Sequence, residues 1–165
     1  MVALKDRRLP AAVVASDAPD WTAALTTITP AAAETLAAAA HTLCPHDALP
    51  PRCYRRVALM IDRDAAAAPA LAARIAEAAA ALDAHQPLPF VDLSEGGRAA
   101  ALRAIESTMA FHALHRGTIR HLYDDREVWQ ALGYEGASFD LGGYRTRGFD
   151  DLDWLPDPPR AACEG

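Results

Sequence analysis

The chain is poor in lysine, in aromatic side chains and in long apolar runs. Lys5 is the only lysine among 165 residues, and the net charge is −6. No arginine-rich stripe with interleaved aromatic residues is present, so we expect no nucleic-acid partner. No apolar stretch reaches the roughly 20 residues of a transmembrane helix, so we expect no membrane span.

Cysteine is also scarce, and the three thiols match no metal or haem motif. Cys44, Cys53 and Cys163 lack the spacing of zinc, iron–sulfur or haem-attachment sites. Cys44 and Cys53 flank a proline-rich turn and can approach each other, so a pairing stays open. The favoured interpretation is two small buried hydrophobic residues in a reducing compartment.

The N-terminus carries a pair of arginines, Arg7 and Arg8, as an export signal does. The apolar stretch behind them is only about six residues long and is broken by Pro10, whereas a signal needs roughly 7–15. We therefore expect a cytoplasmic protein, with a periplasmic location as the alternative.

Alanine dominates what is present. Apolar residues make up 52% of the chain but aromatic residues only 7%. Alanine favours helix and buries little area per residue, and no strand-like alternation occurs. The sequence predicts an all-α fold, a small bundle of four to six helices with a thin core. Three regions are expected: an N-terminal arm (1–27) with Trp21 as its anchor, a helical domain (28–132) and an extended C-terminal arm (133–165).

Capping residues and prolines give the expected helix starts. Thr29 and Pro30 predict a helix over 30–43, and Pro51 and Pro69 predict the next two starts. Ser94 is the predicted N-cap of the longest helix, at about 97–116, which a break or kink at Gly117 follows. Helix is expected to continue over 118–123, with a last short helix over 126–132.

Three histidines deserve a test as metal ligands. His112 and His115 lie one turn apart, His121 follows, and Asp124 or Asp125 can supply a carboxylate. No second helix with a matching motif supports such a site, so packed or hydrogen-bonded histidines are the favoured interpretation. A stand-alone enzyme that uses this cluster remains an alternative.

Other chemical motifs are equally weak. His46 and Asp47 can pose as a general base with an orienting carboxylate, although adjacent residues in a turn more often bond its backbone. No serine has a nucleophile-elbow context, and no glycine motif follows a strand. We predict that this chain holds no catalytic or cofactor-binding residues.

The stretch 118–159 contains two of the three tryptophans and three of the four tyrosines. Past Leu132 its glycines predict turns and short extended pieces. Such an aromatic arm must lie either on its own helices or on another protein, where aromatic and arginine side chains serve as anchors. The predicted interface residues are Trp129, Tyr134, Phe139, Tyr144, Arg147, Phe149 and Trp154.

Several short motifs resemble those of gluconate 2-dehydrogenase subunit 3-like proteins. The segment ITPAAAETLAAAAHTLCPHD (28–47) and a helix that ends in MIDR (60–63) resemble the opening of that family. Pro45 and Asp47 match its P-x-D turn. A later pattern, T-x-x-x-x-[FY]-x-D with a glycine-rich aromatic tail, is matched by Thr118, Tyr123, Asp125, Gly133, Tyr134 and Gly136. The resemblance covers residues 28–155.

This resemblance implies a role as an accessory subunit. Members are small subunits of flavin-dependent dehydrogenases whose large subunit is of the glucose–methanol–choline (GMC) oxidoreductase type. The expected partner is therefore a GMC-type flavoprotein that holds FAD and acts on a sugar, polyol or related alcohol. This chain would bind and stabilise it in a hetero-oligomer without binding a cofactor itself. The "GGN" of the gluconate enzymes is replaced here by DDREVWQALGYEG, so the substrate is not carried over. An assembly chaperone or interaction module is a further alternative.

Overall fold

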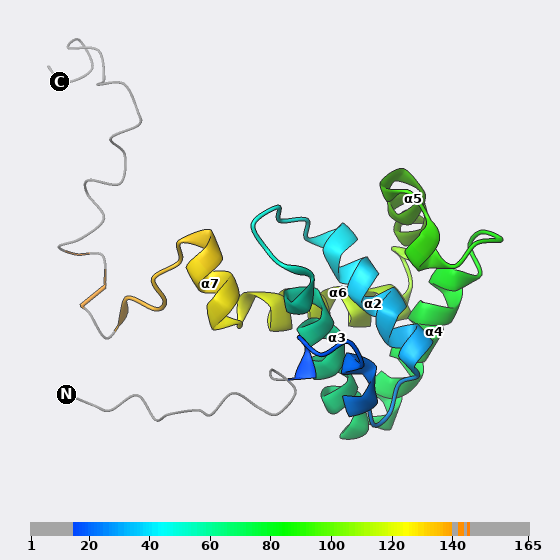
Figure 1. Ribbon diagram of the computed structural model, residues 1–165, viewed down its shortest axis with the longest axis horizontal. Helices are drawn as coiled ribbons and strands as arrows, with labels where there is room; N and C mark the ends of the chain where they lie inside the picture. Colours follow the sequence, from blue (N-terminus) through cyan, green and yellow to red (C-terminus); the bar gives the residue numbers. More distant parts are fainter. Residues whose placement is uncertain (1–14, 140–141, 144, 146–165) are drawn as a thin grey trace, which may run out of the picture. The chain divides into compact units, whose positions relative to one another are not determined.

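The computed structural model describes residues 15–139, 142, 143 and 145. The chain divides into two compact units after Gly133. The described residues of the first unit are helices and their connections, with no strand among them (Figure 1). The prediction of an all-α helical bundle is confirmed.

Six α-helices and two short 3₁₀ helices make up the first unit in its described residues. They are η1 (Trp21–Ala24), α2 (Pro30–Leu43), α3 (Pro51–Ala66), α4 (Pro69–Asp83), η2 (Phe90–Asp92), α5 (Glu95–Ile105), α6 (Met109–Tyr123) and α7 (Arg126–Leu132). None of the helices in the described residues is long and apolar enough to cross a membrane.

The helix starts follow the local signals in the sequence. Thr29 Oγ1 accepts a hydrogen bond from the Ala32 backbone N–H at 3.2 Å, and Pro30 is the first residue of α2. Ser94 Oγ accepts one from Gly97 N–H at 3.2 Å. Each cap satisfies a donor that the helix itself leaves unpaired, so these predicted starts are confirmed.

The core is built from small side chains between closely packed helices. Ala33, Ala39, Ala58 and Ala78 are fully buried on α2, α3 and α4. Helix α6 packs against these three helices and contributes the fully buried Leu114. Larger core side chains fill the remaining space; they are Leu36, Ile61, Ile75, Leu82 and Phe90.

The predicted long fourth helix is wrong in its boundaries. The chain forms two helices, α5 and α6, with the break at residues 106–108 and none at Gly117. Thr108 causes the break, because its Oγ1 accepts from Phe111 N–H at 3.0 Å and donates to the Ile105 carbonyl at 2.8 Å. It is thus the N-cap of α6.

Gly117 lies inside α6 for a packing reason. A Cβ atom at this position would lie 3.0 Å from both Cγ1 and Cδ1 of Ile61 on α3. The absence of a side chain therefore lets α6 approach α3 closely. The cost of glycine in a helix, about 1 kcal/mol relative to alanine, is offset by this contact.

Replacing Gly117 with valine is expected to lower the free energy of unfolding by about 1–3 kcal/mol, because the added methyl groups overpack the α3–α6 contact. Urea denaturation measures the change. Gly96→Val is the control, since nothing lies within 4 Å of a Cβ at Gly96. Equal effects of the two substitutions would contradict the packing role of Gly117.

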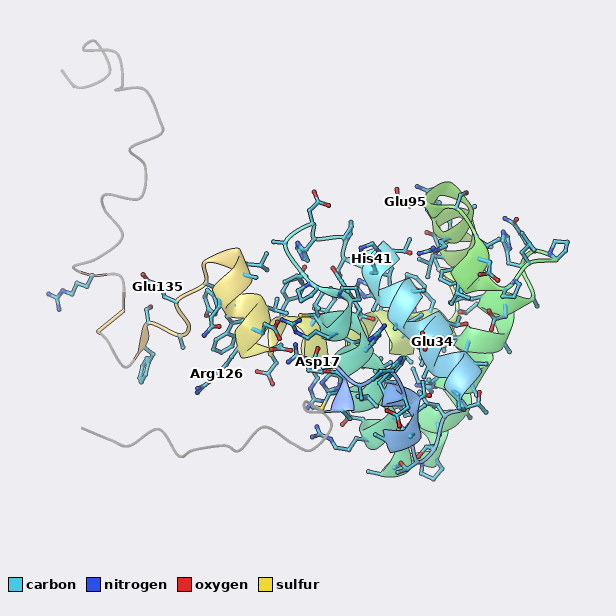
Figure 2. The ribbon with its side chains drawn as sticks, viewed as in Figure 1. Asp17, Glu34, His41, Glu95, Arg126 and Glu135 are labelled. Atoms are coloured by element: carbon cyan, nitrogen blue, oxygen red, sulfur yellow. The ribbon has the colours of Figure 1, made fainter. Side chains whose placement is uncertain are left out.

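The described part of the predicted N-terminal arm, residues 15–27, packs on the helical unit. Trp21 is 2% exposed, and its Nε1 donates to Glu34 Oε1 on α2 at 3.0 Å (Figure 2 labels Glu34). Asp62 on α3 accepts hydrogen bonds from the N–H groups of Thr26, Thr27 and Ile28 at 2.8–2.9 Å. Trp21 thus serves as an anchor, and Asp62 fixes the segment that leads into α2.

Candidate functional site

Helix α7 is fastened to α3 by an ion-pair network, which we call the α3–α7 network. Arg52 and Arg56 lie one turn apart on α3 and face Asp125 and Glu127 at the start of α7. Arg52 Nε donates to Glu127 Oε1 at 2.9 Å. Arg56 pairs with the other Glu127 oxygen, and its Nε lies 3.0 Å from Asp125 Oδ2. The Arg56 and Asp125 side chains are 9% and 13% exposed, so this is a largely desolvated contact.

The network favours the charged forms of Glu127 and Arg56. The hydrogen bond from Arg52 holds the pKa of Glu127 below its ordinary value, with burial opposing and Arg56 adding to the effect. Burial alone would lower the pKa of Arg56, but Glu127 and Asp125 outweigh it and raise that pKa. Ion pairs in a partly desolvated environment therefore stabilise the packing of α7 against α3.

Further contacts fix both ends of α7. Asp125 Oδ1 caps it by accepting from Glu127 N–H at 2.9 Å. Trp129 Nε1 donates to the Tyr123 carbonyl at 2.6 Å. Gly133 ends the helix in the left-handed conformation, with φ of 73°. The chain therefore leaves the helical unit from a fixed position.

Exposed apolar side chains lie at the end of α7 and in the residues that follow it. Leu132, the last residue of α7, is 43% exposed. In the second unit Tyr134 is 50% exposed and Phe139 is 88% exposed. Phe139 lies on a turn in which Gly143 N–H bonds the Ser138 carbonyl at 2.8 Å, with both Gly142 and Gly143 at positive φ.

The predicted interface residues differ in exposure, and only three of the seven are among the described residues. Trp129 is half-buried against its own unit, whereas Tyr134 and Phe139 are exposed. The others lie outside the described residues; they are Tyr144, Arg147, Phe149 and Trp154.

The three candidate histidines do not form a cluster. His112 and His115 are exposed on α6, where the His115 ring stacks on Phe111 with centroids 5.8 Å apart. The His121 side chain is 5% exposed, and its Nε2 lies 2.9 Å from Asp64 Oδ2. Burial lowers the pKa of His121 more than Asp64 raises it. In the part of the chain that the structure describes, no three histidine, cysteine, aspartate or glutamate side chains converge on a metal position.

The turn at residues 44–47 is held by two tyrosines. Tyr54 Oη donates to the Cys44 carbonyl at 2.9 Å and accepts from His46 N–H at 3.2 Å. His46 Nε2 lies 2.8 Å from Tyr123 Oη. The imidazole thus contacts a phenol on α6, which supports the structural interpretation of the His46–Asp47 pair. The sequence gave no sign of these hydroxyl contacts.

The two described cysteines are buried free thiols, as the favoured interpretation predicted. Burial raises the pKa of Cys44, against an opposing hydrogen bond with Tyr123. Burial also raises the pKa of Cys53. Both groups are therefore protonated at neutral pH, which does not suit a nucleophile. Cys163 lies outside the described residues.

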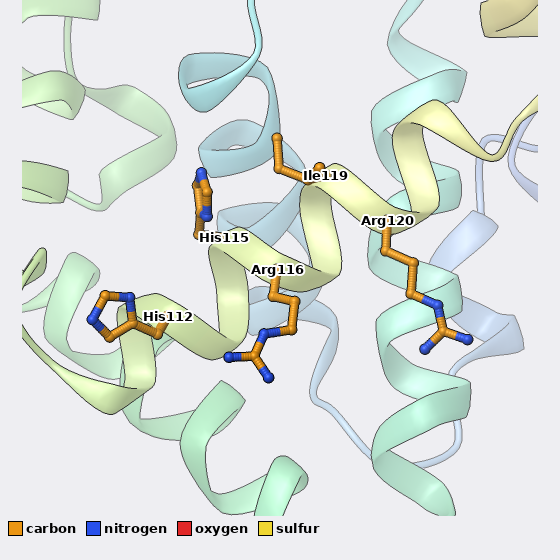
Figure 3. A pocket seen from close by; sticks show the side chains of 5 residues that line it. All are labelled: His112, His115, Arg116, Ile119 and Arg120. Atoms are coloured by element: carbon orange, nitrogen blue, oxygen red, sulfur yellow. The ribbon is translucent and has the colours of Figure 1, made fainter.

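A hollow of about 320 Å³ lies along the outer side of α6. Figure 3 shows its lining, in which Arg116 and Arg120 extend from one edge of the helix and His115 and Ile119 from the other. His112 completes the lining. The sequence pointed to His112 and His115 but not to Arg116, Ile119 or Arg120, although the spacing of three and four residues from Arg116 to Ile119 and Arg120 was a visible signal.

Known proteins add no further information about this site. No protein family, curated protein or solved structure matches the chain.

Proposed function

We propose that this chain is a non-catalytic small subunit that binds and stabilises a larger flavin-containing subunit of an oxidoreductase. One observation carries the binding role: large apolar side chains stand exposed directly after a helix that is fixed at both ends. The identity of the partner, a GMC-type flavoprotein that acts on a sugar, polyol or related alcohol, is supported by the resemblance over residues 28–155.

The exposure of Phe139 supports an interface. Fully burying a phenylalanine side chain is worth about 1.5–3 kcal/mol relative to leaving it in water. At 88% exposure Phe139 has nearly all of that stabilisation still to gain. Tyr134 adds an aromatic ring with a polar tip, a type enriched among the residues that dominate binding.

The α3–α7 network supports the same role through preorganisation. A segment that starts from a fixed helix loses less conformational freedom on binding than one that starts from a loose tail. A stable interface buries about 1,200–2,000 Å² in total, which a few exposed aromatic side chains and their neighbours can begin to supply. The chain would stabilise its partner by mass action, because it binds the folded form alone. FAD and the chemistry belong to the partner.

Co-expression with a GMC-type flavoprotein tests the proposal. We expect the two proteins to co-elute on gel filtration with the visible absorbance of flavin, and the partner to melt at a higher temperature in the complex. A folded chain that elutes apart from the flavoprotein would contradict the proposal. An assembly chaperone, which the same exposed residues also suit, would be absent from the mature complex.

Truncation after Gly133 is expected to weaken binding to the flavoprotein at least tenfold, which corresponds to about 1.4 kcal/mol. Phe139→Ala should produce a smaller loss of the same kind. Circular dichroism should show the helical unit intact, because α7 is capped within its own unit. Leu88→Ala is the control, since Leu88 is a 57% exposed apolar residue in the loop between α4 and η2. Unchanged affinity of the truncated chain would count against the C-terminal interface.

A further inference from the structure

Helix α6 has an exposed face whose residues have the sequence spacing typical of helix–helix packing. Met109, Ile119 and Tyr123 are 58%, 39% and 38% exposed. With His112 and Arg116 they recur at alternating steps of three and four residues, which places all five on one side of the helix. The opposite side holds the buried Ala110, Leu114, Thr118 and Leu122.

This face is positively charged in an otherwise acidic chain. No ion pair formed by the described residues includes Arg116. Arg120 lies 3.6 Å from Asp64, but the same carboxylate is 2.9 Å from His121 Nε2 and 3.7 Å from Arg63. Asp64 is thus shared by Arg63, Arg120 and His121, so the positive charge of Arg116 and Arg120 is only partly neutralised along the edge of the hollow.

We propose that the outer face of α6 binds an acidic amphipathic helix of a partner protein. An apolar stripe on that helix would cover Met109, Ile119 and Tyr123. Carboxylates on its flank would pair with Arg116 and Arg120, and charge complementarity would set its orientation. The inference goes beyond the proposed function, because it concerns the helical unit and requires no flavoprotein.

A second copy of this chain is a poorer occupant. Pairing of this face about a two-fold axis makes the same patch meet itself. Arg116 lies at the middle of the seam, so antiparallel pairing would bring the two Arg116 side chains together. Like charges that meet in a closing interface oppose its formation, whereas an acidic helix neutralises them.

Titration of the full chain with two synthetic peptides tests the proposal. Both peptides match α6 in length and carry a leucine stripe; the flanking residues are glutamates in one and lysines in the other. We expect amide chemical-shift changes confined to α6 and its neighbours with the glutamate peptide and none with the lysine peptide. Affinity should fall as salt rises, because the paired charges are screened.

Arg116→Glu is expected to weaken binding of the glutamate peptide about tenfold and to permit binding of the lysine peptide. The substitution should leave the fold intact, because the new carboxylate would precede Arg120 by four residues, which is the favourable i, i+4 spacing. Arg74→Glu, at an exposed arginine of α4, is the control. The proposal is overturned by no response to the glutamate peptide, by equal responses to both peptides, or by equal behaviour of the two variants. Failure of a flavoprotein to co-purify would leave this test unaffected.

Discussion

Replacing Asp62 with alanine is expected to lower the free energy of unfolding by about 3–5 kcal/mol. Asp62 is 3% exposed and accepts from the backbone N–H groups of Thr26, Thr27 and Ile28 and from Thr26 Oγ1. Alanine would leave three backbone donors without their acceptor at the junction before α2. A buried unpaired donor such as Ile28 N–H costs about 1–3 kcal/mol, and the part-buried donors of Thr26 and Thr27 add less each because water can reach them.

Urea denaturation at neutral pH measures this loss, with Glu77→Ala at an exposed site of α4 as the control. Asp62→Asn should lose about half as much, because its one carbonyl oxygen can still accept two of the bonds. An effect of Asp62→Ala no larger than that of the control would show that Asp62 does not fix the segment that leads into α2.

The same carboxylate should make stability depend on pH. Burial raises the pKa of Asp62, but the hydrogen bonds from Ile28, Thr26 and Thr27 outweigh burial and bring it below the ordinary 3.8. A lowered folded-state pKa contributes stability that is present above about pH 4 and is lost as pH falls through the folded value. The difference in stability between wild type and Asp62→Asn should therefore shrink in acid. A difference that is constant with pH would contradict this assignment.

Arg56→Met is expected to lower the free energy of unfolding by about 2–4 kcal/mol, because methionine fills the space but leaves Asp125 without its arginine in a largely desolvated contact, while Glu127 keeps only Arg52. Helix α7 is short and depends on this contact, so its amide protons should lose protection from exchange before the rest of the unit does. Hydrogen exchange separates this local effect from the global one.

Arg126→Met provides the matched control, since Arg126 is an exposed arginine at the first position of α7 (Figure 2). Adding Asp125→Asn and Glu127→Gln to Arg56→Met should restore part of the stability, because neutral groups then replace the carboxylates that have lost Arg56. Equal losses for Arg56→Met and Arg126→Met would show that the α3–α7 network does not hold α7.

The candidate metal site depended on whether the helix that carries His112 and His121 continues through Gly117. His112 and His121 are nine residues apart, which is two and a half turns of an α-helix. They point to opposite sides only if the helix continues through Gly117, where the sequence allowed a break. The contact with Ile61 on α3 explains why glycine stands at position 117. The Ile61 side chain occupies the space beside Gly117, so glycine is required there for packing within a continuous helix.

The sequence by itself determined the features that arise within a few residues. Alanine content and apolar spacing selected an all-α fold, and Thr29, Ser94 and the first-turn prolines set the helix starts, because a cap acts within one turn of its helix. The aromatic-rich, glycine-rich character of the chain past Leu132 was also evident from composition, whereas the exposure of its side chains was left open.

Only the tertiary structure decided the contacts that span the chain. Asp62 meets residues 34–36 positions earlier, and Arg56 meets Glu127 71 positions later. No local preference encodes such pairs, because they form only after α2, α3 and α6 have packed and brought the groups within hydrogen-bond distance. The charged face of α6 likewise became visible only once packing had shown which side of that helix is buried.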